Sequence, residues 1–455
     1  MPPLGIFRSY DIRGIVGKDL DEKIMQKIGL ALGNYVHDDV VLAYDVRTHS
    51  PMLKEAFAHG FLSSGFSVED CGLLTLGSGM YHAWRANKTF AYITASHLTK
   101  EWNGVKFFHG NGIGFLEHEN FRVRDIFTGE IKPSGLGKQS EKSNFSIIDE
   151  YRKYLLSKVS MKRRLDVVLD CGNGCAGLLA PMLFQEAGFR VEAIYPELDG
   201  NFPNRLPDPI ERELGELKSR VRGKDLGIGY DGDADRTALI DDKGDFMTPE
   251  ETSYVILSEL LKTEKGPVIV NVECTRAVDV IADKFGCSVI RVPVGHTFLM
   301  DGVNRNHASY GVESAGHYCI PKFVPFDDAV VVGLYVSEVL AKREQPLSEL
   351  RKDVPKTHFE RLNFFCPDDA KFSVLDSLKE VLKKSYDDVN TMDGVRVDLR
   401  NGWALIRVSN TAPLIRLTVE GDTESDKREL QKAFIEFLED QLNERGLDLQ
   451  PEHLN

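Results

Sequence analysis

The most specific chemical signal in the sequence is the motif DGDADR at residues 231–236, in which aspartates occupy alternate positions. Carboxylates spaced in this way along an extended loop can converge on one hard cation, and Gly232 and Ala234 leave room for the loop to curl. An EF-hand calcium loop is excluded, because its sixth position requires Gly and holds Arg236, and its twelfth requires Glu and holds Asp242. Three oxygen ligands with open coordination positions suit Mg²⁺ awaiting a phosphate oxygen, which Arg236 would bind as a bidentate donor. The alternative is an Asp-rich solvated turn.

A candidate nucleophile, Ser96, lies in the segment TASH at the end of a predicted strand. A serine acts as a nucleophile only where something raises its reactivity or holds a phosphoryl group opposite it. No G-x-S-x-G elbow surrounds Ser96, and the adjacent His97 does not by itself make a Ser-His-Asp triad. Asn103-Gly104, a pair typical of two-residue hairpin turns, predicts that the chain folds back past Ser96 and brings the ammonium group of Lys106 near it. An ordinary turn serine is the alternative.

A candidate phosphate site follows a predicted strand in the last quarter of the chain. Arg407, Ser409, Asn410 and Thr411 stand within five positions, and Arg416 follows. A guanidinium, two hydroxyls, an amide and loop N–H groups in one turn are typical of a phosphate cradle.

Two weaker segments complete the set of candidate residues. Glu313, Ser314 and His317 offer hydrogen-bonding groups of the kind that bind sugar hydroxyls, although such loops often merely end strands. The segment FRSYDIRG places Tyr10 and Arg13 near a glycine turn, where Arg13 would either bind phosphate or form an internal salt bridge.

Three related segments, residues 40–72, 166–196 and 267–295, are predicted to position these groups. Each opens with a short apolar run typical of a buried strand and continues with helical apolar spacing. Each predicted helix ends near a glycine, as a helix stop should: Gly65, Gly188 and Gly286. The order strand, helix, strand predicts βαβ units in largely parallel sheets.

Each unit is followed by an apolar strand that enters a loop rich in Ser, Asp, Glu, His and Gly, at residues 91–108, 226–240 and 308–320. Loops at the carboxyl ends of strands in open α/β sheets are where ligands bind. We therefore expect three related domains that each contribute one loop to a shared cleft.

Changes in composition predict four domains, at residues 1–142, 143–244, 245–358 and 359–455. A polar stretch at 134–146 separates the first two, and Pro249 is well placed for the start of a helix in the third. The last region carries strand patterns and an amphipathic helix over about 424–444, which indicates an α+β module of a different kind.

The chain of 455 residues is 42% apolar and has a formal net charge of −14 without a long Lys/Arg block. An acidic balance argues against nucleic acid or an anionic membrane as a partner. No stretch has the length of a membrane helix, and the first residues lack the apolar core of a signal peptide. Seven cysteines at irregular spacing, with no CxxC pair, indicate neither a disulfide framework nor a zinc site. We expect a cytoplasmic protein.

Together these segments resemble the α-D-phosphohexomutase family, which includes phosphomannomutase/phosphoglucomutase and phosphoglucosamine mutase. The family's phosphoserine loop T-A-S-H-N-P is similar to residues 94–97, its metal loop D-G-D-x-D-R to residues 231–236, its sugar loop G-E-x-S-G-H to residues 312–317, and its phosphate loop R-x-S-N-T-x-P to residues 407–413. The resemblance runs from Phe7 to about Glu420. It implies an α/β fold with three related α/β domains of mixed, largely parallel sheets and a different C-terminal α+β domain, heart-shaped around a central cleft.

The resemblance implies a phosphosugar mutase that interconverts hexose 1-phosphates and hexose 6-phosphates through a phosphoserine and a hexose bisphosphate, which also acts as activator. Mannose and glucose are favoured, on the weak signal of Thr94. The implied site comprises catalytic residues (Ser96, His97, Lys106, Arg13, Arg236), ligands for one Mg²⁺ (Ser96, Asp231, Asp233, Asp235), sugar-binding residues (Glu313, Ser314, His317, His296), phosphate-binding residues (Arg407, Ser409, Asn410, Thr411, Arg416) and Tyr10. Closure of the last domain over the cleft is expected, and the oligomeric state stays open. The alternatives are a phosphoglucosamine mutase, a non-catalytic phosphosugar-binding paralogue and a metal-dependent phosphatase.

The sequence departs from the family pattern at several positions. Leu98 and Thr99 replace the Asn-Pro pair after the serine loop, where no chemistry is expected. Ala315 stands where a sugar-binding serine is common, and Glu273 stands where some bacterial members carry a lysine that contacts substrate. Ala412 replaces a frequent glutamate of the phosphate loop. The preferred sugar therefore remains open.

Overall fold

The computed structural model describes residues 4–409 and 413–451. Packing divides the chain into two compact units, which we describe separately. Unit 1 comprises Met1–Ile269 and Gly295–Asp353, and unit 2 comprises Val270–Val294 and Val354–Asn455.

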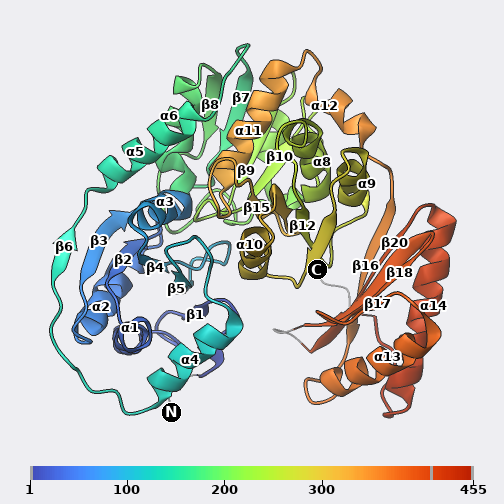
Figure 1. Cartoon of the computed structure of the whole chain (residues 1–455), viewed down its shortest axis with the longest axis horizontal. Helices are drawn as coiled ribbons and strands as arrows, with labels where there is room; N and C mark the ends of the chain where they lie inside the picture. Colours follow the sequence, from blue (N-terminus) through green and yellow to red (C-terminus); the bar gives the residue numbers. More distant parts are fainter. Residues whose placement is uncertain (1–3, 410–412, 452–455) are drawn as a thin grey trace. The chain divides into compact units, whose positions relative to one another are not determined.

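Unit 1 begins with a six-stranded mixed sheet ordered β1-β5-β4-β2-β3-β6. Strands β4, β2, β3 and β6 run parallel, and β5 pairs antiparallel with both β4 and β1. The strands are β1 (Ile12–Ile15), β2 (Val40–Tyr44), β3 (Val68–Leu73), β4 (Thr89–Ile93), β5 (Trp102–Phe108) and β6 (Gln139–Glu141). The accompanying helices are η1 (Leu4–Ile6), α1 (Glu22–Val36), α2 (Ser50–Leu62), α3 (Leu76–Ala86) and α4 (Glu117–Thr128). Helices α1 and α2 pack side by side over a core that includes Phe57 and Ile28 (Figure 1, blue).

The hairpin turn predicted at Asn103-Gly104 is wrong, although the chain does fold back. Both residues lie inside β5 and pair with β1, and the reversal takes place between Ile93 and Trp102. A Cβ at Gly104 would lie 2.0 Å from the carbonyl oxygen of Ile12. The glycine therefore permits close approach of two strands rather than a turn.

The second sheet of unit 1 has the order β11-β10-β9-β7-β8, with β8, β7 and β9 parallel and the remaining pairs antiparallel. Its strands are β7 (Asp166–Asp170), β8 (Arg190–Ile194), β9 (Leu226–Tyr230), β10 (Thr237–Ile240) and β11 (Phe246–Met247). The helices along this stretch are α5 (Asn144–Ser157), η2 (Cys175–Leu178), α6 (Ala180–Glu186), η3 (Glu211–Glu213) and α7 (Gly215–Arg220).

The rest of unit 1 contains the antiparallel pair β14 (Tyr310–Val312) and β15 (Tyr318–Cys319). Its helices are α8 (Pro249–Leu260), α10 (His296–Arg305), α11 (Ala329–Lys342), α12 (Leu347–Leu350) and η4 (Arg351–Asp353). As predicted, Pro249 starts a helix, where Thr248 and Glu251 form a capping box. Helix α11 is apolar on nearly every side and almost wholly buried, as a central core helix should be.

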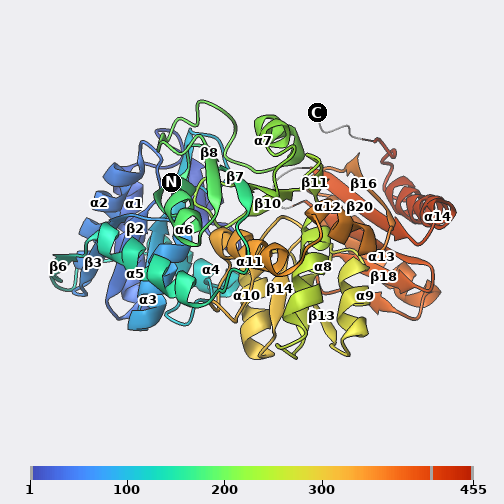
Figure 2. The same cartoon turned by 90° about the horizontal axis from the view of Figure 1, so that it is seen from above.

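Unit 2 contains the segment β12 (Val268–Asn271, which begins in unit 1), α9 (Ala277–Lys284) and β13 (Val289–Val292), and a five-stranded antiparallel sheet ordered β16-β20-β19-β18-β17. The strands are β16 (His358–Phe365), β17 (Val389–Asn390), β18 (Val395–Leu399), β19 (Gly402–Val408) and β20 (Leu414–Gly421). Helices α13 (Lys371–Ser385) and α14 (Glu424–Asn443) pack on one face of this sheet (Figure 2).

The predicted fold class is confirmed: α/β sheets of mixed direction are followed by a different α+β module. Strands β18 to β20 and helix α14 lie where the patterns predicted them, whereas β16, α13 and β17 were not predicted. The predicted helix-ending glycines Gly65, Gly188 and Gly286 all have positive φ. The predicted domain boundaries stay predictions. Within residues 4–409 and 413–451, no helix is both long enough and apolar enough to cross a membrane.

Candidate active site

Ser96 lies in the loop between β4 and β5 and is almost completely buried. Its backbone has φ +52°, a left-handed conformation that is unfavourable for a residue with a side chain. Two contacts hold it there. The Ser96 N–H donates to Thr94 Oγ1 at 2.8 Å, and its carbonyl oxygen accepts from Arg47 Nη2 at 2.7 Å. The contacts with Thr94 and Arg47 therefore fix the backbone of Ser96 and, with it, the direction of its hydroxyl.

Arg47, which the sequence analysis missed, anchors this whole loop. Its guanidinium donates to the carbonyl oxygens of Ser96, Leu98, Thr99 and Trp102 at distances of 2.6–3.0 Å. The side chain is fully buried and is paired with Asp45 at 3.1 Å. The only local signal was the pair Asp45-x-Arg47 directly after an apolar strand, because the four carbonyls it binds lie about fifty residues away.

The aspartates of the 231–236 loop meet Ser96. The loop joins β9 to β10, and the carboxylate oxygens of Asp231, Asp233 and Asp235 lie within 4.8 Å of one another. Ser96 Oγ donates to Asp231 Oδ2 at 2.9 Å. The other oxygen of Asp231 accepts the N–H groups of Asp235 and Arg236, at 3.0 and 3.2 Å, and so closes the loop.

The three carboxylates fit a hard divalent cation. Among the described residues, Asp233 Oδ1 and Asp235 Oδ1 are buried without a hydrogen-bond partner, which is unfavourable for ionised oxygens. Burial, and then the neighbouring carboxylates of Asp235 and Asp233, raise the pKa of Asp231 well above its ordinary value. A cation at this place would satisfy the free oxygens and offset the repulsion between the carboxylates.

Lys106 is buried and His97 is half-buried beside this cluster, and the two side chains differ in charge. Lys106 Nζ lies 2.6 Å from Asp235 Oδ2 and 3.1 Å from Asp233 Oδ2. Burial opposes its charge, but these two carboxylates outweigh burial and raise the pKa of Lys106. Burial, and then the positive charges of Arg236 and Arg13, disfavour the imidazolium and lower the pKa of His97 well below its ordinary value. At neutral pH the cluster therefore holds an ammonium and a neutral imidazole, whose Nδ1 lies 3.4 Å from Ser96 Oγ.

Arg13, on β1, faces the serine loop. Its Nη1 donates to the carbonyl oxygen of Ala95 at 3.4 Å, and its Nε pairs with Asp11 at 2.6 Å. Tyr10, just before this strand, packs edge-on against the rings of His296 and Phe298. Both predicted residues therefore lie in unit 1 with the rest of the cluster. Arg13 forms an internal salt bridge, which was one of the two roles predicted for it.

Arg236 is held by His317, from the loop between β14 and β15. Arg236 Nε donates to His317 Nε2 at 2.8 Å, so the proton of this imidazole lies on Nδ1, which donates to Asp327 Oδ2 at 2.7 Å. His296 stacks on His317 with ring centres 5.3 Å apart. Both nitrogens of His317 are thus engaged within the protein. The sequence predicts sugar binding for His317, and it gives no local signal that Asp327 would contact this histidine.

The other predicted sugar-binding residues lie in the same loop region. Glu313 is buried, and its Oε2 has no hydrogen-bond partner among the described residues. Ser314 is partly exposed beside it. A buried carboxylate oxygen without a partner is suited to accept a ligand hydroxyl.

The predicted phosphate residues lie in unit 2. Arg407 lies one residue before the end of β19, and Arg416 lies opposite it on β20. Lys371 Nζ donates to the carbonyl oxygen of Ser409 at 2.6 Å and so fixes one end of the loop. Asn410 and Thr411 lie outside the described residues.

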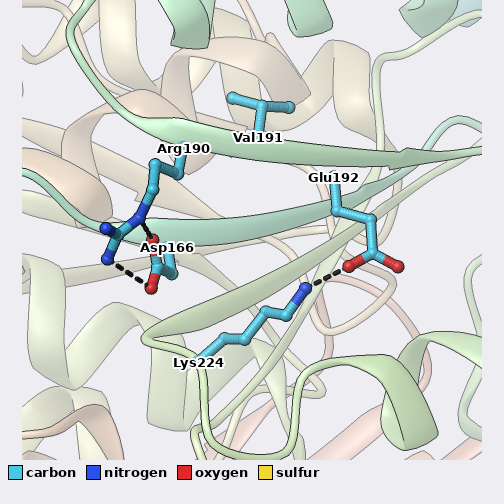
Figure 3. Close-up of a pocket in the computed structure, with 5 residues that line it drawn as sticks. All are labelled: Asp166, Arg190, Val191, Glu192 and Lys224. Atoms are coloured by element: carbon cyan, nitrogen blue, oxygen red, sulfur yellow. Dashed lines mark hydrogen bonds and ion pairs between the residues drawn. The ribbon is translucent and has the colours of Figure 1, made fainter.

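A separate surface pocket is lined by Asp166, Arg190, Val191, Glu192 and Lys224 (Figure 3). Its charged side chains pair with one another, Arg190 with Asp166 and Lys224 with Glu192. Asp166 and Arg190 begin the parallel strands β7 and β8, so the pocket lies at the amino ends of these strands, whereas the 231–236 loop follows the carboxyl end of β9. None of its lining residues belongs to the cluster around Ser96.

Comparison with known proteins gives a family. Four consecutive segments match the phosphoglucomutase/phosphomannomutase family: residues 5–133 its alpha/beta/alpha domain I, 148–244 domain II, 248–358 domain III and 362–437 its C-terminal domain.

Individual relatives agree. A probable phosphoglucosamine mutase of Methanopyrus kandleri is 32% identical over 95% of this chain and 97% of its own length. A phosphomannomutase/phosphoglucomutase of Pseudomonas putida is 32% identical over 95% of each chain. The crystal structure of a phosphoglucomutase/phosphomannomutase family protein from Burkholderia thailandensis superposes with a TM-score of 0.90 at 26% identity, over 99% of this chain and 100% of its own. The chain belongs to the phosphoglucomutase/phosphomannomutase family of phosphosugar mutases.

Proposed function

We propose that the protein interconverts the 1- and 6-phosphates of a hexose, with mannose and glucose as favoured sugars, by way of phosphorylated Ser96 and a hexose bisphosphate. The observation that carries this proposal is the 2.9 Å contact between Ser96 Oγ and Asp231, within a cluster that fits a divalent cation. Phosphoryl transfer depends on positioning and charge neutralisation, which this cluster supplies.

In the proposed reaction a sugar hydroxyl oxygen bonds to phosphorus as the bond from phosphorus to Ser96 Oγ breaks. The sugar hydroxyl loses its proton and Ser96 Oγ gains one. His97 is neutral and lies near Ser96 Oγ, so it can carry this proton, whereas Lys106 stays charged and offsets the negative charge of the phosphoryl group. The reverse transfer from the other end of the bisphosphate restores the phosphoserine.

The remaining residues bind and orient. Ser96, Asp231, Asp233 and Asp235 would hold Mg²⁺, which supplies charge neutralisation at the transferring group when bound. Arg236, oriented by His317, and Arg13 would bind the reacting phosphate. Glu313 would accept sugar hydroxyls, and the loop that begins at Arg407 would bind the phosphate that does not react.

A second candidate is a phosphoglucosamine mutase, favoured by the similarity to the Methanopyrus kandleri relative. Incubation with mannose 1-phosphate, glucose 1-phosphate or glucosamine 6-phosphate, with Mg²⁺ and a trace of the matching bisphosphate, tests both. Fast conversion of the first two supports the main proposal, and fast conversion of the third alone supports the second. Steady release of inorganic phosphate without isomerisation would indicate a phosphatase. Ser96→Ala should abolish isomerisation, and substantial residual turnover would refute the phosphoserine.

A further inference from the structure

Three arginines share one face of the sheet in unit 2. Arg407 on β19 lies opposite Arg416 on β20, which lies opposite Asn363 on β16, so these side chains point to the same face. Arg361 stands two residues before Asn363 and points the same way. The apolar residues that alternate with them, such as Ile406, form the core under α13 and α14. The arginines therefore lie on the face away from these helices.

Glu273, from the loop after β12, lies between two of these guanidiniums. Its Oε1 accepts from Arg407 Nη1 at 2.7 Å, and its Oε2 accepts from Arg361 Nη2 at 3.0 Å. The Glu273 side chain is only 6% exposed, whereas that of Arg361 is 36% exposed. Burial favours the neutral acid, but Arg361 and then Arg407 outweigh it and lower the pKa of Glu273. The buried carboxylate is therefore charged at neutral pH.

A second carboxylate, Asp393, fixes Arg407 from another side. Its oxygens accept from Arg407 Nε and Nη2, each at 3.0 Å. The next residue, Gly394, has φ +84°, and a Cβ there would lie 2.6 Å from Arg407 Cγ. Only glycine fits this approach without strain. Asp393 and Glu273 together use three of the five N–H groups of Arg407.

Arg361 and Arg416 keep most of their donors for a ligand. Within the part of the chain that the structure describes, Arg361 donates only to Glu273, and Arg416 donates only to Asn363 Oδ1, at 3.0 Å. Each guanidinium has five N–H groups in a planar fork that matches phosphate oxygens. Arg361 and Arg416 are thus better supplied with available donors than Arg407.

We propose that Arg361 binds the non-reacting phosphate together with Arg416 and Arg407. The negative charge of Glu273 lowers the affinity of this site for phosphate. The inference rests on the proposed function, because that function requires a site for the phosphate that does not react. Three guanidiniums and two carboxylates leave one net positive charge, against about −1.5 to −2 on a phosphate monoester. A bisphosphate must leave this site, turn and rebind, and a moderate affinity for each phosphate would allow it to do so.

Calorimetric titration of the full chain with glucose 6-phosphate, in Mg²⁺ and low salt, tests the proposal. Arg361→Gln should weaken binding about tenfold, since it loses charged hydrogen bonds, and Arg361→Lys should recover part of the loss. Glu273→Gln should tighten binding by about three- to tenfold, and the gain should shrink in 0.5 M salt. If glucose 6-phosphate does not bind, mannose 6-phosphate takes its place.

Two exposed residues of α14 provide matched controls. Arg428→Gln and Glu436→Gln make the same charge changes at side chains that are 75% and 63% exposed, and the affinity should not change. Wild-type affinity in Arg361→Gln, or weaker binding in Glu273→Gln when its thermal unfolding is normal, would overturn the inference. Failure of the mutase proposal is distinguishable: the affinity pattern would persist, but no isomer would be converted.

Discussion

Ser96 Oγ and Asp231 Oδ2 lie 2.9 Å apart, although 135 residues separate them in the sequence. Each stands in a loop at the carboxyl end of a strand, β4 for Ser96 and β9 for Asp231. This contact places a buried serine hydroxyl against carboxylates that fit a cation, in a chain of the phosphosugar mutase family.

Loss of a carboxylate from the 231–236 loop is expected to lower turnover strongly without unfolding the protein. Asp233→Asn removes one of the two unpaired carboxylate oxygens and should lower kcat at least about a hundredfold, the scale of a lost electrostatic contact in a transition state. Titration of the metal-free protein with Mn²⁺ should show weakened binding in this variant. The exposed Asp376→Asn is the matched control, and equal Mn²⁺ affinity in Asp233→Asn would exclude the loop as the metal site.

Arg47 is expected to act on the reaction through the position of Ser96. Arg47→Lys keeps the charge but loses most of the four carbonyl contacts. Since displacement of a reacting group by about 1 Å can lower a rate about a hundredfold, kcat should fall on that scale while KM changes little. The exposed Arg220→Lys should behave as the wild type. A rise in KM with unchanged kcat would show that Arg47 contributes to binding instead.

His317 is expected to orient Arg236 through the acceptor Nε2. His317→Gln retains a polar side chain that can accept from Arg236, whereas His317→Phe leaves the half-buried guanidinium donor unpaired. We expect kcat to fall by about tenfold in the first variant and about a hundredfold in the second. Steady-state kinetics of both variants, beside Asp327→Asn, test this order. Equal activity of the Gln and Phe variants would argue against the hydrogen bond to Arg236.

Asp328 predicts a specific pH dependence of stability. Burial raises the pKa of this carboxyl from 3.8 to about 6, although Tyr151 and the N–H of Val331 donate to it. The folded state binds the proton more tightly than the unfolded state, so the contribution of Asp328 to stability is fully present below about pH 4 and is lost as pH rises through about 6. Above both pKa values, the ionised Asp328 carboxylate therefore lowers the free energy of unfolding by about 3 kcal/mol.

Asp328→Asn removes this ionisation but keeps a helix-capping oxygen for α11. Relative to the wild type, its free energy of unfolding should be larger, and this gain in stability should be about 2 kcal/mol greater at pH 7 than at pH 4.5. Urea unfolding at both pH values measures the difference. The same difference at both pH values would refute the raised pKa.

Much of the fold followed from local patterns. Apolar runs at β2, β7 and β12, the glycines Gly65 and Gly188, and the cap before Pro249 all act between residues near in the sequence, so their geometry can be derived from it. Asn103-Gly104 is the exception, where the local pattern did not predict the local structure. The same pair suits a turn or a close strand contact, and pairing with β1 decided the outcome.

By itself, the sequence determined which short segments carry chemistry: the aspartates at alternate positions in 231–236, Ser96 at the end of a strand, and Arg407 in a polar turn. Tertiary structure alone decided how these groups are supported. Arg47 under the serine loop, Asp327 behind His317, and Arg361 beside Glu273 each act on residues from distant segments. Hydrogen bonds and burial depend on proximity in space, and distance along the chain carries little information about that proximity.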